Sequence, residues 1–157
     1  MIRIGLGELA AALGCPVTWP DGGRPNGKEV VVESIVTDSR KVDFGALFAA
    51  LPGSQVDGHD FAPAAVRLGA VALLVQRRLD LAGEQSGGRR VPQLVVPDVL
   101  QALGRLAALL RERLDPVVIG ITGSNGKTTV KEMLASILRP VGEVLATQGN
   151  YNNELGV

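Results

Sequence analysis

Apolar positions along the chain follow two alternating patterns, which predict strands and helices in turn. Short runs rich in Val, Ile and Leu, such as 71–76 and 116–122, are typical of buried strands. Longer segments repeat their apolar residues every three or four positions, as amphipathic helices do. This alternation predicts an α/β fold with a largely parallel sheet. The predicted strands are 45–51, 71–76, 91–98, 116–122 and 143–148, together with one within 30–40 that ends in a polar loop, and the predicted helices are 7–14, 60–70, 97–115 and 126–142.

The same spacing predicts which residues share a helix face. In 60–70, Phe61, Ala65 and Leu68 lie on one face, and Gly69 is expected to end the helix. The other two long helices have apolar faces formed by Val99, Leu103, Leu106 and Leu110, and by Val130, Met133, Leu134, Ile137 and Leu138.

The helix predicted at 97–115 divides the chain into two parts. Asp98 is a good N-cap for this helix. Residues 1–97 contain enough strands and helices for a small α/β domain. Residues 98–157 add a linker helix and one strand–helix–strand unit, which is a thin core for an independent domain. We therefore expect one domain at 1–97 and the start of a second parallel-sheet domain within 98–157.

The balance of charges argues against one class of partner. The 157 residues include 16 Lys and Arg and 16 Asp and Glu, so the formal charge is zero. Nucleic-acid surfaces need an excess of basic residues, so we expect no nucleic-acid partner. Cys15 is the only cysteine, which favours a reducing compartment. There is no signal-peptide pattern and no apolar run long enough for a bilayer, so we expect a cytoplasmic protein without membrane insertion.

A glycine-rich loop joins the strand predicted at 116–122 to the helix that follows. A helix N-terminus presents free N–H groups to an anion, and glycines let the backbone approach a phosphate. Lys127 can reach the β- and γ-phosphates, and the Thr128 hydroxyl suits Mg²⁺. The spacing varies from G-x-x-x-x-G-K-[ST], because Ile121 stands where the first glycine is required. The loop predicts ATP or GTP binding by Gly123, Ser124, Asn125, Gly126, Lys127, Thr128 and Thr129; the alternative is a strand-to-helix turn with an incidental lysine.

Several segments together resemble the Mur ligases, the enzymes that build the peptide stem of bacterial peptidoglycan. The loop "GITGSNGKTTVKEM" is similar to their ATP-binding loop, and 36–75 is similar to their N-terminal UDP-sugar-binding domain. The segment "FGALF" departs from the family pattern at Phe44 and Ala46. The resemblance implies a UDP-substrate-binding α/β domain followed by the truncated start of a P-loop ATP-binding domain.

The segments "VKEM" and "NNELGV" favour the family member that joins D-alanyl-D-alanine to UDP-N-acetylmuramoyl-tripeptide. The resemblance implies that ATP phosphorylates the tripeptide carboxylate and that the amine of D-alanyl-D-alanine attacks the acyl phosphate. Lys127 and Thr128 would be the catalytic residues, with Thr128 holding Mg²⁺. Further metal-binding positions of the family lie beyond Val157, so we expect the chain alone to be inactive. We also expect the full-length enzyme to be a monomer.

The resemblance also implies substrate contacts in two regions. Asn152 and Asn153 would contact the tripeptide. Thr37 and Ser39 follow a strand, where α/β proteins place ligands, although a polar turn held by Asp38 or Ser39 is the alternative. His59 is either a capping or packing residue or a neighbour of the UDP-sugar. A rival to the enzyme is a non-catalytic module that binds a UDP-sugar or nucleotide. The uridine contacts that the resemblance implies are Thr37, Ser39, Ser54, Gln55 and Val56.

Overall fold

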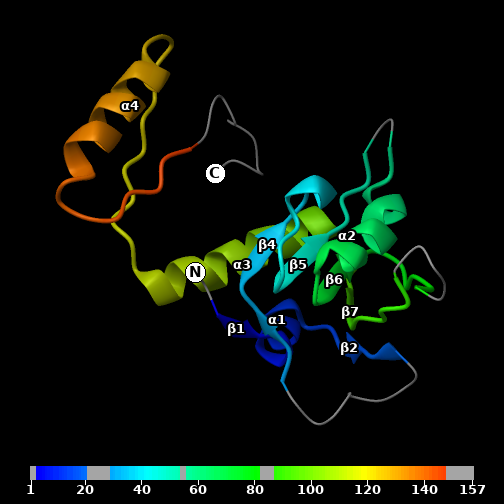
Figure 1. Ribbon diagram of the computed structural model, residues 1–157. Coiled ribbons are helices and arrows are strands. Elements are labelled where there is room, and N and C mark those ends of the chain that lie inside the picture. Colours follow the sequence, from blue (N-terminus) through cyan, green and yellow to red (C-terminus); the bar gives the residue numbers. More distant parts are fainter. Residues whose placement is uncertain (1–2, 21–28, 54–55, 82–86, 148–157) are drawn as a thin grey trace. The chain divides into compact units, whose positions relative to one another are not determined.

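The computed structural model describes residues 3–20, 29–53, 56–81 and 87–147, and the chain divides into two compact units, Met1–Leu110 and Arg111–Val157. Figure 1 shows the elements in chain order. The strands are β1 (Ile4–Gly5), β2 (Val17–Thr18), β3 (Val31–Val32), β4 (Ser34–Val36), β5 (Ala46–Ala49), β6 (Ala72–Val75) and β7 (Gln93–Val95). The helices are α1 (Leu6–Leu13), α2 (Ala62–Leu68), α3 (Val99–Leu114) and α4 (Lys127–Leu138), with the 3-10 helices η3 (Ser39–Lys41) and η4 (Gly58–Phe61).

A five-stranded sheet forms the centre of the first unit, in the order β2-β7-β6-β5-β4. The strands from β4 to β7 are parallel, and β2 runs antiparallel to β7. Strands β1 and β3 pair separately as an antiparallel ribbon. Because parallel strands point the same way, the carboxyl ends of β4 to β7 meet at one edge of the sheet, which we call the carboxyl edge.

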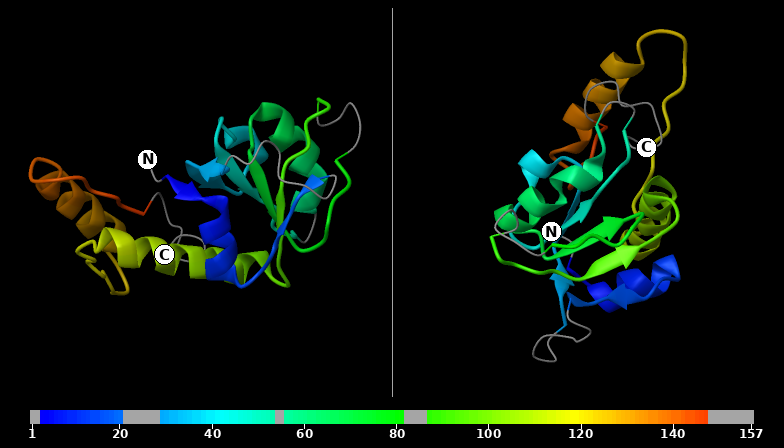
Figure 2. Two further views of the ribbon diagram at one scale, coloured as in Figure 1. Left: turned by 90° about the horizontal axis from the view of Figure 1, so that it is seen from below. Right: turned by 90° about the vertical axis from the view of Figure 1, so that its right-hand side faces the viewer.

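Helices cover both faces of this sheet, because the side chains of a strand point alternately to opposite faces. Leu74 and Leu94 are fully buried on the face covered by α1 and α3. Phe48 and Leu73 are buried on the other face, against α2. Figure 2 shows this arrangement of helix, sheet and helix from two further directions. The predicted α/β fold with a parallel sheet is confirmed in the first unit.

Most of α3 packs into the first unit. Val99 and Leu106 are buried in the cluster that α1 and the sheet also form. The carboxylate of Asp98 accepts a hydrogen bond from the backbone N–H of Gln101 at 3.0 Å, which confirms the predicted N-cap. The first compact unit therefore ends at Leu110, whereas the sequence reasoning placed its end before Asp98. The physical reason is the buried face of α3, which covers the sheet.

The prediction of a single strand before the polar loop within 30–40 is wrong, because two short strands replace it. Val31–Val32 pairs with β1, and Ser34–Val36 pairs with β5 in the main sheet. Glu33 lies at the change of partner, and its N–H donates to the carbonyl of Gly45 at 2.9 Å. The apolar run 30–36 thus contributes one strand to each of two sheets, and its composition did not reveal this division.

The face predicted for helix 60–70 is also wrong in part. Phe61 is 42% exposed and Leu68 is 53% exposed, while Ala65 and Val66 are fully buried. The α-helix begins only at Ala62, after the tighter turn of η4, so the buried face differs from the one that a continuous helix gives. Gly69 caps the helix, as predicted.

In the second unit, the predicted helix at 126–142 is confirmed as α4, but the two predicted strands are not formed in residues 111–147. Val117 is 92% exposed and Leu145 is fully exposed. A strand needs a neighbour with which to exchange backbone hydrogen bonds, and no described segment of this unit provides one. Within the described residues, no helix has both the length and the apolar character to cross a membrane.

Candidate functional site

The glycine-rich loop before α4 adopts backbone angles that glycine tolerates best. Gly123 has φ 151° and Gly126 has φ 78°, which are values that other residues rarely adopt. Gly126 is the N-cap of α4, and its carbonyl accepts from the N–H of Val130 at 3.0 Å. The loop therefore turns directly into the helix, as the sequence predicted.

The N-terminus of α4 and the side chain of Lys127 together fit an anion. Gly126 has no side chain with which to cap the helix, so the N–H groups of the first turn point outward with partial positive charge. The Nζ of Lys127 donates to the carbonyl of Gly123 at 2.5 Å, which places the ammonium across the loop. Ser124 and Asn125 are exposed between the two glycines. These groups suit the phosphates of a nucleotide.

Thr128 and Thr129 follow Lys127 in the exposed first turn of α4. A hydroxyl oxygen is a ligand type that Mg²⁺ accepts beside phosphate oxygens. Within residues 3–20, 29–53, 56–81 and 87–147, no group of three Asp, Glu, His or Cys side chains could hold a metal ion. The described residues therefore offer Mg²⁺ hydroxyl groups beside the loop rather than a preformed carboxylate cage.

Two residues predicted to contact the substrate lie at the carboxyl edge of the first unit. Thr37 follows β4 and is exposed, and Ser39 begins η3. The carboxylate of Asp38 accepts from the guanidinium of Arg40 at 2.9 Å and from its backbone N–H at 3.0 Å. These bonds lower the pKa of Asp38 from 3.8 to about 2. Asp38 is therefore a turn residue, as one alternative predicted, while Thr37 faces solvent.

The turn after β5 carries a third predicted contact. Pro52 pairs with Asp57, and the N–H of Gly53 donates to the carbonyl of Val56 at 3.1 Å. Val56 is 53% exposed. Since β4 and β5 are parallel neighbours, this turn and Thr37 both lie at the carboxyl edge. The other predicted contacts, Ser54, Gln55, Asn152 and Asn153, lie outside the described residues.

Two further residues meet at this edge: Arg77, which the sequence reasoning did not consider, and His59, for which it left packing and a place near the UDP-sugar open. The side chain of His59 is fully buried, beside Asp57 and the backbone of Gln76. Arg77 follows directly and donates to Asp57 at 2.9 Å. The position of Gln76 and Arg77, immediately after an apolar strand, was the signal that could have found Arg77. Nothing in the local sequence showed where the ring of His59 points.

A cavity of about 430 Å³ opens at the opposite edge of the sheet, beside Gln93, the first residue of β7. Its walls include Trp19, Arg78 and Arg90. None of the described residues that the sequence predicted for the site lines it. The cavity therefore does not include the predicted contacts, and Arg78, the residue after Arg77, lies in its wall.

Two family descriptions match the chain in two consecutive regions. "Mur ligase family, catalytic domain" matches residues 31–111, and "Mur ligase middle domain" matches residues 121–157. The interval between the matches, 112–120, begins two residues after Leu110, where the first compact unit ends.

Curated relatives of this chain are UDP-N-acetylmuramoyl-tripeptide--D-alanyl-D-alanine ligases. That of Escherichia coli (strain K12) is 42% identical over 157 residues, which are 100% of this chain and 31% of the relative. That of Haemophilus influenzae is 47% identical over 134 residues, which cover 83% of this chain and 28% of the relative. The chain thus spans less than a third of the length of these relatives.

Solved structures of such ligases share the fold. The ligase from Acinetobacter baumannii has a TM-score of 0.79 at 37% identity, over 99% of this chain and 32% of that one. The MurF ligase from Thermotoga maritima, solved in complex with ADP, has a TM-score of 0.64 at 34% identity, over 80% of this chain and 27% of that one. Since one family description alone covers more than half of the residues, and the fold and glycine-rich loop agree with it, the chain belongs to the Mur ligase family.

Proposed function

We propose that this chain provides the substrate-binding unit and the nucleotide-binding loop of an ATP-dependent ligase that joins D-alanyl-D-alanine to UDP-N-acetylmuramoyl-tripeptide in peptidoglycan synthesis. The observation that carries the proposal is the loop 123–129, where Lys127 lies across two left-handed glycines at the start of α4. The relatives that match along this chain carry that activity in their names. The ADP complex of the Thermotoga maritima ligase supports ATP as the nucleotide.

In this proposal, each part of the loop has a physical task. Backbone N–H groups from Gly123 to Thr129 hold the phosphates, because the helix N-terminus is positive. Lys127 neutralises charge that develops on the γ-phosphate, and Thr128 holds Mg²⁺. ATP supplies the phosphoryl group that activates the tripeptide carboxylate. The chain itself therefore contributes position and charge rather than a nucleophile.

The carboxyl edge of the first unit binds the uridine end of the substrate in this proposal. Thr37, Ser39 and Val56 lie on segments that follow neighbouring parallel strands, which is where open α/β sheets bind ligands. Ser54 and Gln55 belong to the same proposed contact set, and Asn152 and Asn153 to the tripeptide contacts. We also propose a cytoplasmic location, since the one cysteine of these 157 residues suits a reducing compartment, and a monomeric state for the full-length enzyme.

A chimera tests the activity. The 157 residues replace the matching 31% of the Escherichia coli relative, and phosphate release is measured with ATP, UDP-N-acetylmuramoyl-tripeptide and D-alanyl-D-alanine. We expect release that needs both substrates and falls by about 100-fold or more in Lys127→Ala. The matched control is Lys131→Gln, one turn further along α4, whose Nζ bonds to the carbonyl of Thr147. A folded chimera that binds ATP but releases no phosphate contradicts the ligase and supports the non-catalytic binding module.

A further inference from the structure

The buried imidazole of His59 joins two segments at the carboxyl edge. Its Nε2 lies 2.9 Å from the backbone nitrogen of Gln76, and its Nδ1 lies 2.5 Å from a carboxylate oxygen of Asp57. A backbone N–H can only donate, so Nε2 accepts and Nδ1 carries the proton. The imidazole is therefore neutral and donates to Asp57. Both ring nitrogens are used within a side chain that is 0% exposed.

Asp57 links the buried ring of His59 to the guanidinium of Arg77. One oxygen of Asp57 accepts from the backbone N–H and the ring of His59, and the other accepts from the guanidinium of Arg77 at 2.9 Å. The two bonds from His59, with help from Arg77, hold the pKa of Asp57 well below its usual range. The carboxylate thus stays charged between a buried ring and an exposed guanidinium.

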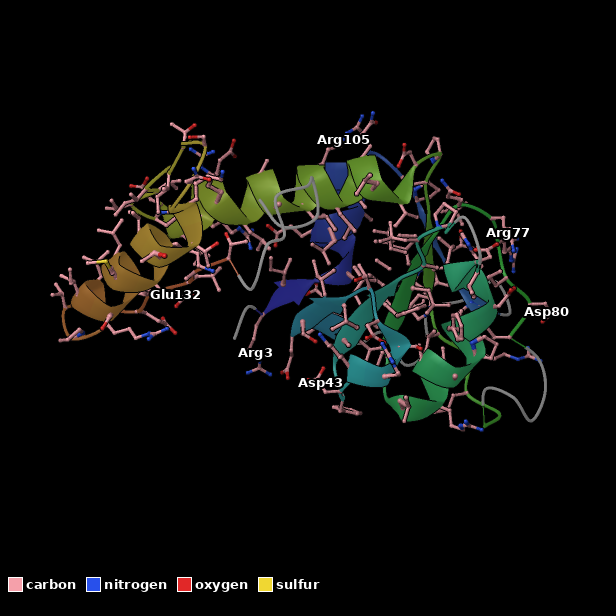
Figure 3. All side chains as sticks on the ribbon, turned by 90° about the horizontal axis from the view of Figure 1, so that it is seen from above. Arg3, Asp43, Arg77, Asp80, Arg105 and Glu132 are labelled. Atoms are coloured by element: carbon pink, nitrogen blue, oxygen red, sulfur yellow. The ribbon has the colours of Figure 1, made fainter. Side chains whose placement is uncertain are left out.

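Arg77 is positioned to meet a ligand. Its side chain is 57% exposed, and Figure 3 shows it at the periphery of the first unit. Among the described residues, Asp57 is its one hydrogen-bonding partner, so most of its N–H groups face solvent. The residue before it, Gln76, donates from its side chain to the carbonyl of Pro97 at 3.2 Å, which ties the ends of β6 and β7 together. Arg77 therefore projects from a segment of the carboxyl edge that hydrogen bonds hold in place.

We propose that Arg77 binds the diphosphate of the nucleotide-linked substrate and that His59, acting through Asp57, is its positioning residue. The substrate's identity rests on the proposed function. A guanidinium matches phosphate oxygens with paired N–H groups, which a lysine cannot do. An isolated surface ion pair contributes little, whereas this one is held by a ring that is itself fixed at both nitrogens. A guanidinium held in place loses less freedom when the ligand binds.

The neighbouring arginine gives a matched control. Arg78 is exposed like Arg77, but it lines the cavity at the opposite edge of the sheet. Replacing either arginine with glutamine removes the same charge. Only the replacement at Arg77 is expected to affect a ligand at the carboxyl edge.

Calorimetric titration of the 157-residue chain with UDP and with uridine tests the contact. We expect UDP to bind more tightly than uridine, and Arg77→Gln to weaken UDP about tenfold or more while leaving uridine unchanged. Arg78→Gln should change neither affinity. Binding of both ligands with UDP unaffected by Arg77→Gln overturns this inference and leaves the proposed function standing. If wild type binds neither ligand, the uridine site of the proposed function fails, and this inference fails with it.

A double-mutant cycle tests the role of His59. His59→Gln should weaken UDP relative to uridine, and should have no further effect once Arg77→Gln is present. An equal effect in both backgrounds shows a structural role and overturns the positioning role. If circular dichroism shows that His59→Gln is unfolded, Asp57→Asn takes its place in the cycle. Its amide oxygen can still accept the N–H of His59, but it lacks the charge that holds Arg77.

Discussion

The side-chain amide of Gln93 binds both polar backbone groups of Leu79. Its oxygen accepts from the N–H of Leu79 at 2.9 Å, and its nitrogen donates to the carbonyl at 2.7 Å. Gln93 is 5% exposed and begins β7, so the segment that leaves β6 is tied to the amino end of the neighbouring strand. The side-chain amide therefore makes the pair of hydrogen bonds that the backbone of a neighbouring strand would make in a sheet.

Gln93→Leu should lower the free energy of unfolding of the first unit by about 1–3 kcal/mol. The leucine fills similar space but leaves the N–H and carbonyl of Leu79 without their partner. Urea unfolding followed by circular dichroism measures the loss. Gln101→Leu is the control, because the amide of Gln101 is exposed and accepts only from Arg105 among the described residues. Equal stability of the two variants contradicts a structural role for the Gln93 amide.

Leu106→Ala tests whether α3 belongs to the first unit. Leu106 is 1% exposed, so removing its side chain should cost about 2–5 kcal/mol in the unfolding of that unit. Met133→Ala on α4, where the side chain is 59% exposed, should change stability little. If Leu106→Ala has no effect on urea unfolding, the first domain ends before Asp98, as the sequence reasoning had it.

Replacing Gly58 with alanine should impair UDP binding, whereas replacing Gly104 with alanine should not. Gly58→Ala places a Cβ 2.5 Å from the carbonyl oxygen of Leu51, so the turn that carries Asp57 must shift, and UDP affinity should fall. Gly104→Ala, in an open position within α3, should stabilise the first unit by about 1 kcal/mol and leave UDP affinity unchanged. Thermal unfolding and UDP titration of both variants measure these effects. Unchanged UDP binding in a folded Gly58→Ala variant would show that the turn carrying Asp57 does not influence ligand binding.

The first unit should lose stability in acid. The folded pKa of Asp38 is about 2, below its ordinary value of 3.8. Its contribution to the free energy of unfolding is therefore fully present above about pH 4 and is lost as the pH falls through 2. Asp57 acts in the same direction. Urea midpoints at pH 7, 4 and 2.5 measure the decline. Arg40→Gln removes the main cause of the Asp38 shift and should flatten the decline; an unchanged pH profile would show that this pair has no influence.

Segments whose structure depends on near neighbours were predictable from the sequence. Helix α1, the N-cap of α3 by Asp98, and the glycine-rich loop before α4 rest on residues within a few positions of one another. The left-handed angles of Gly123 and Gly126 are of this kind, because a residue without a Cβ permits them wherever the fold places it. The residues predicted for nucleotide binding could therefore be named from a short stretch of chain.

Partners that lie far apart in the sequence decided the rest. The run 30–36 divides at Glu33 because β1 and β5 each pair with one part of it. α3 belongs to the first unit because the sheet and α1 bury one of its faces. His59 meets Gln76, 17 residues further on, and Asp57 meets Arg77 at a separation of 20. The sequence by itself determined the local geometry of the glycine-rich loop before α4, whereas the tertiary structure decided strand pairing and the polar contacts at the carboxyl edge, because these depend on distant segments being brought together by the buried core.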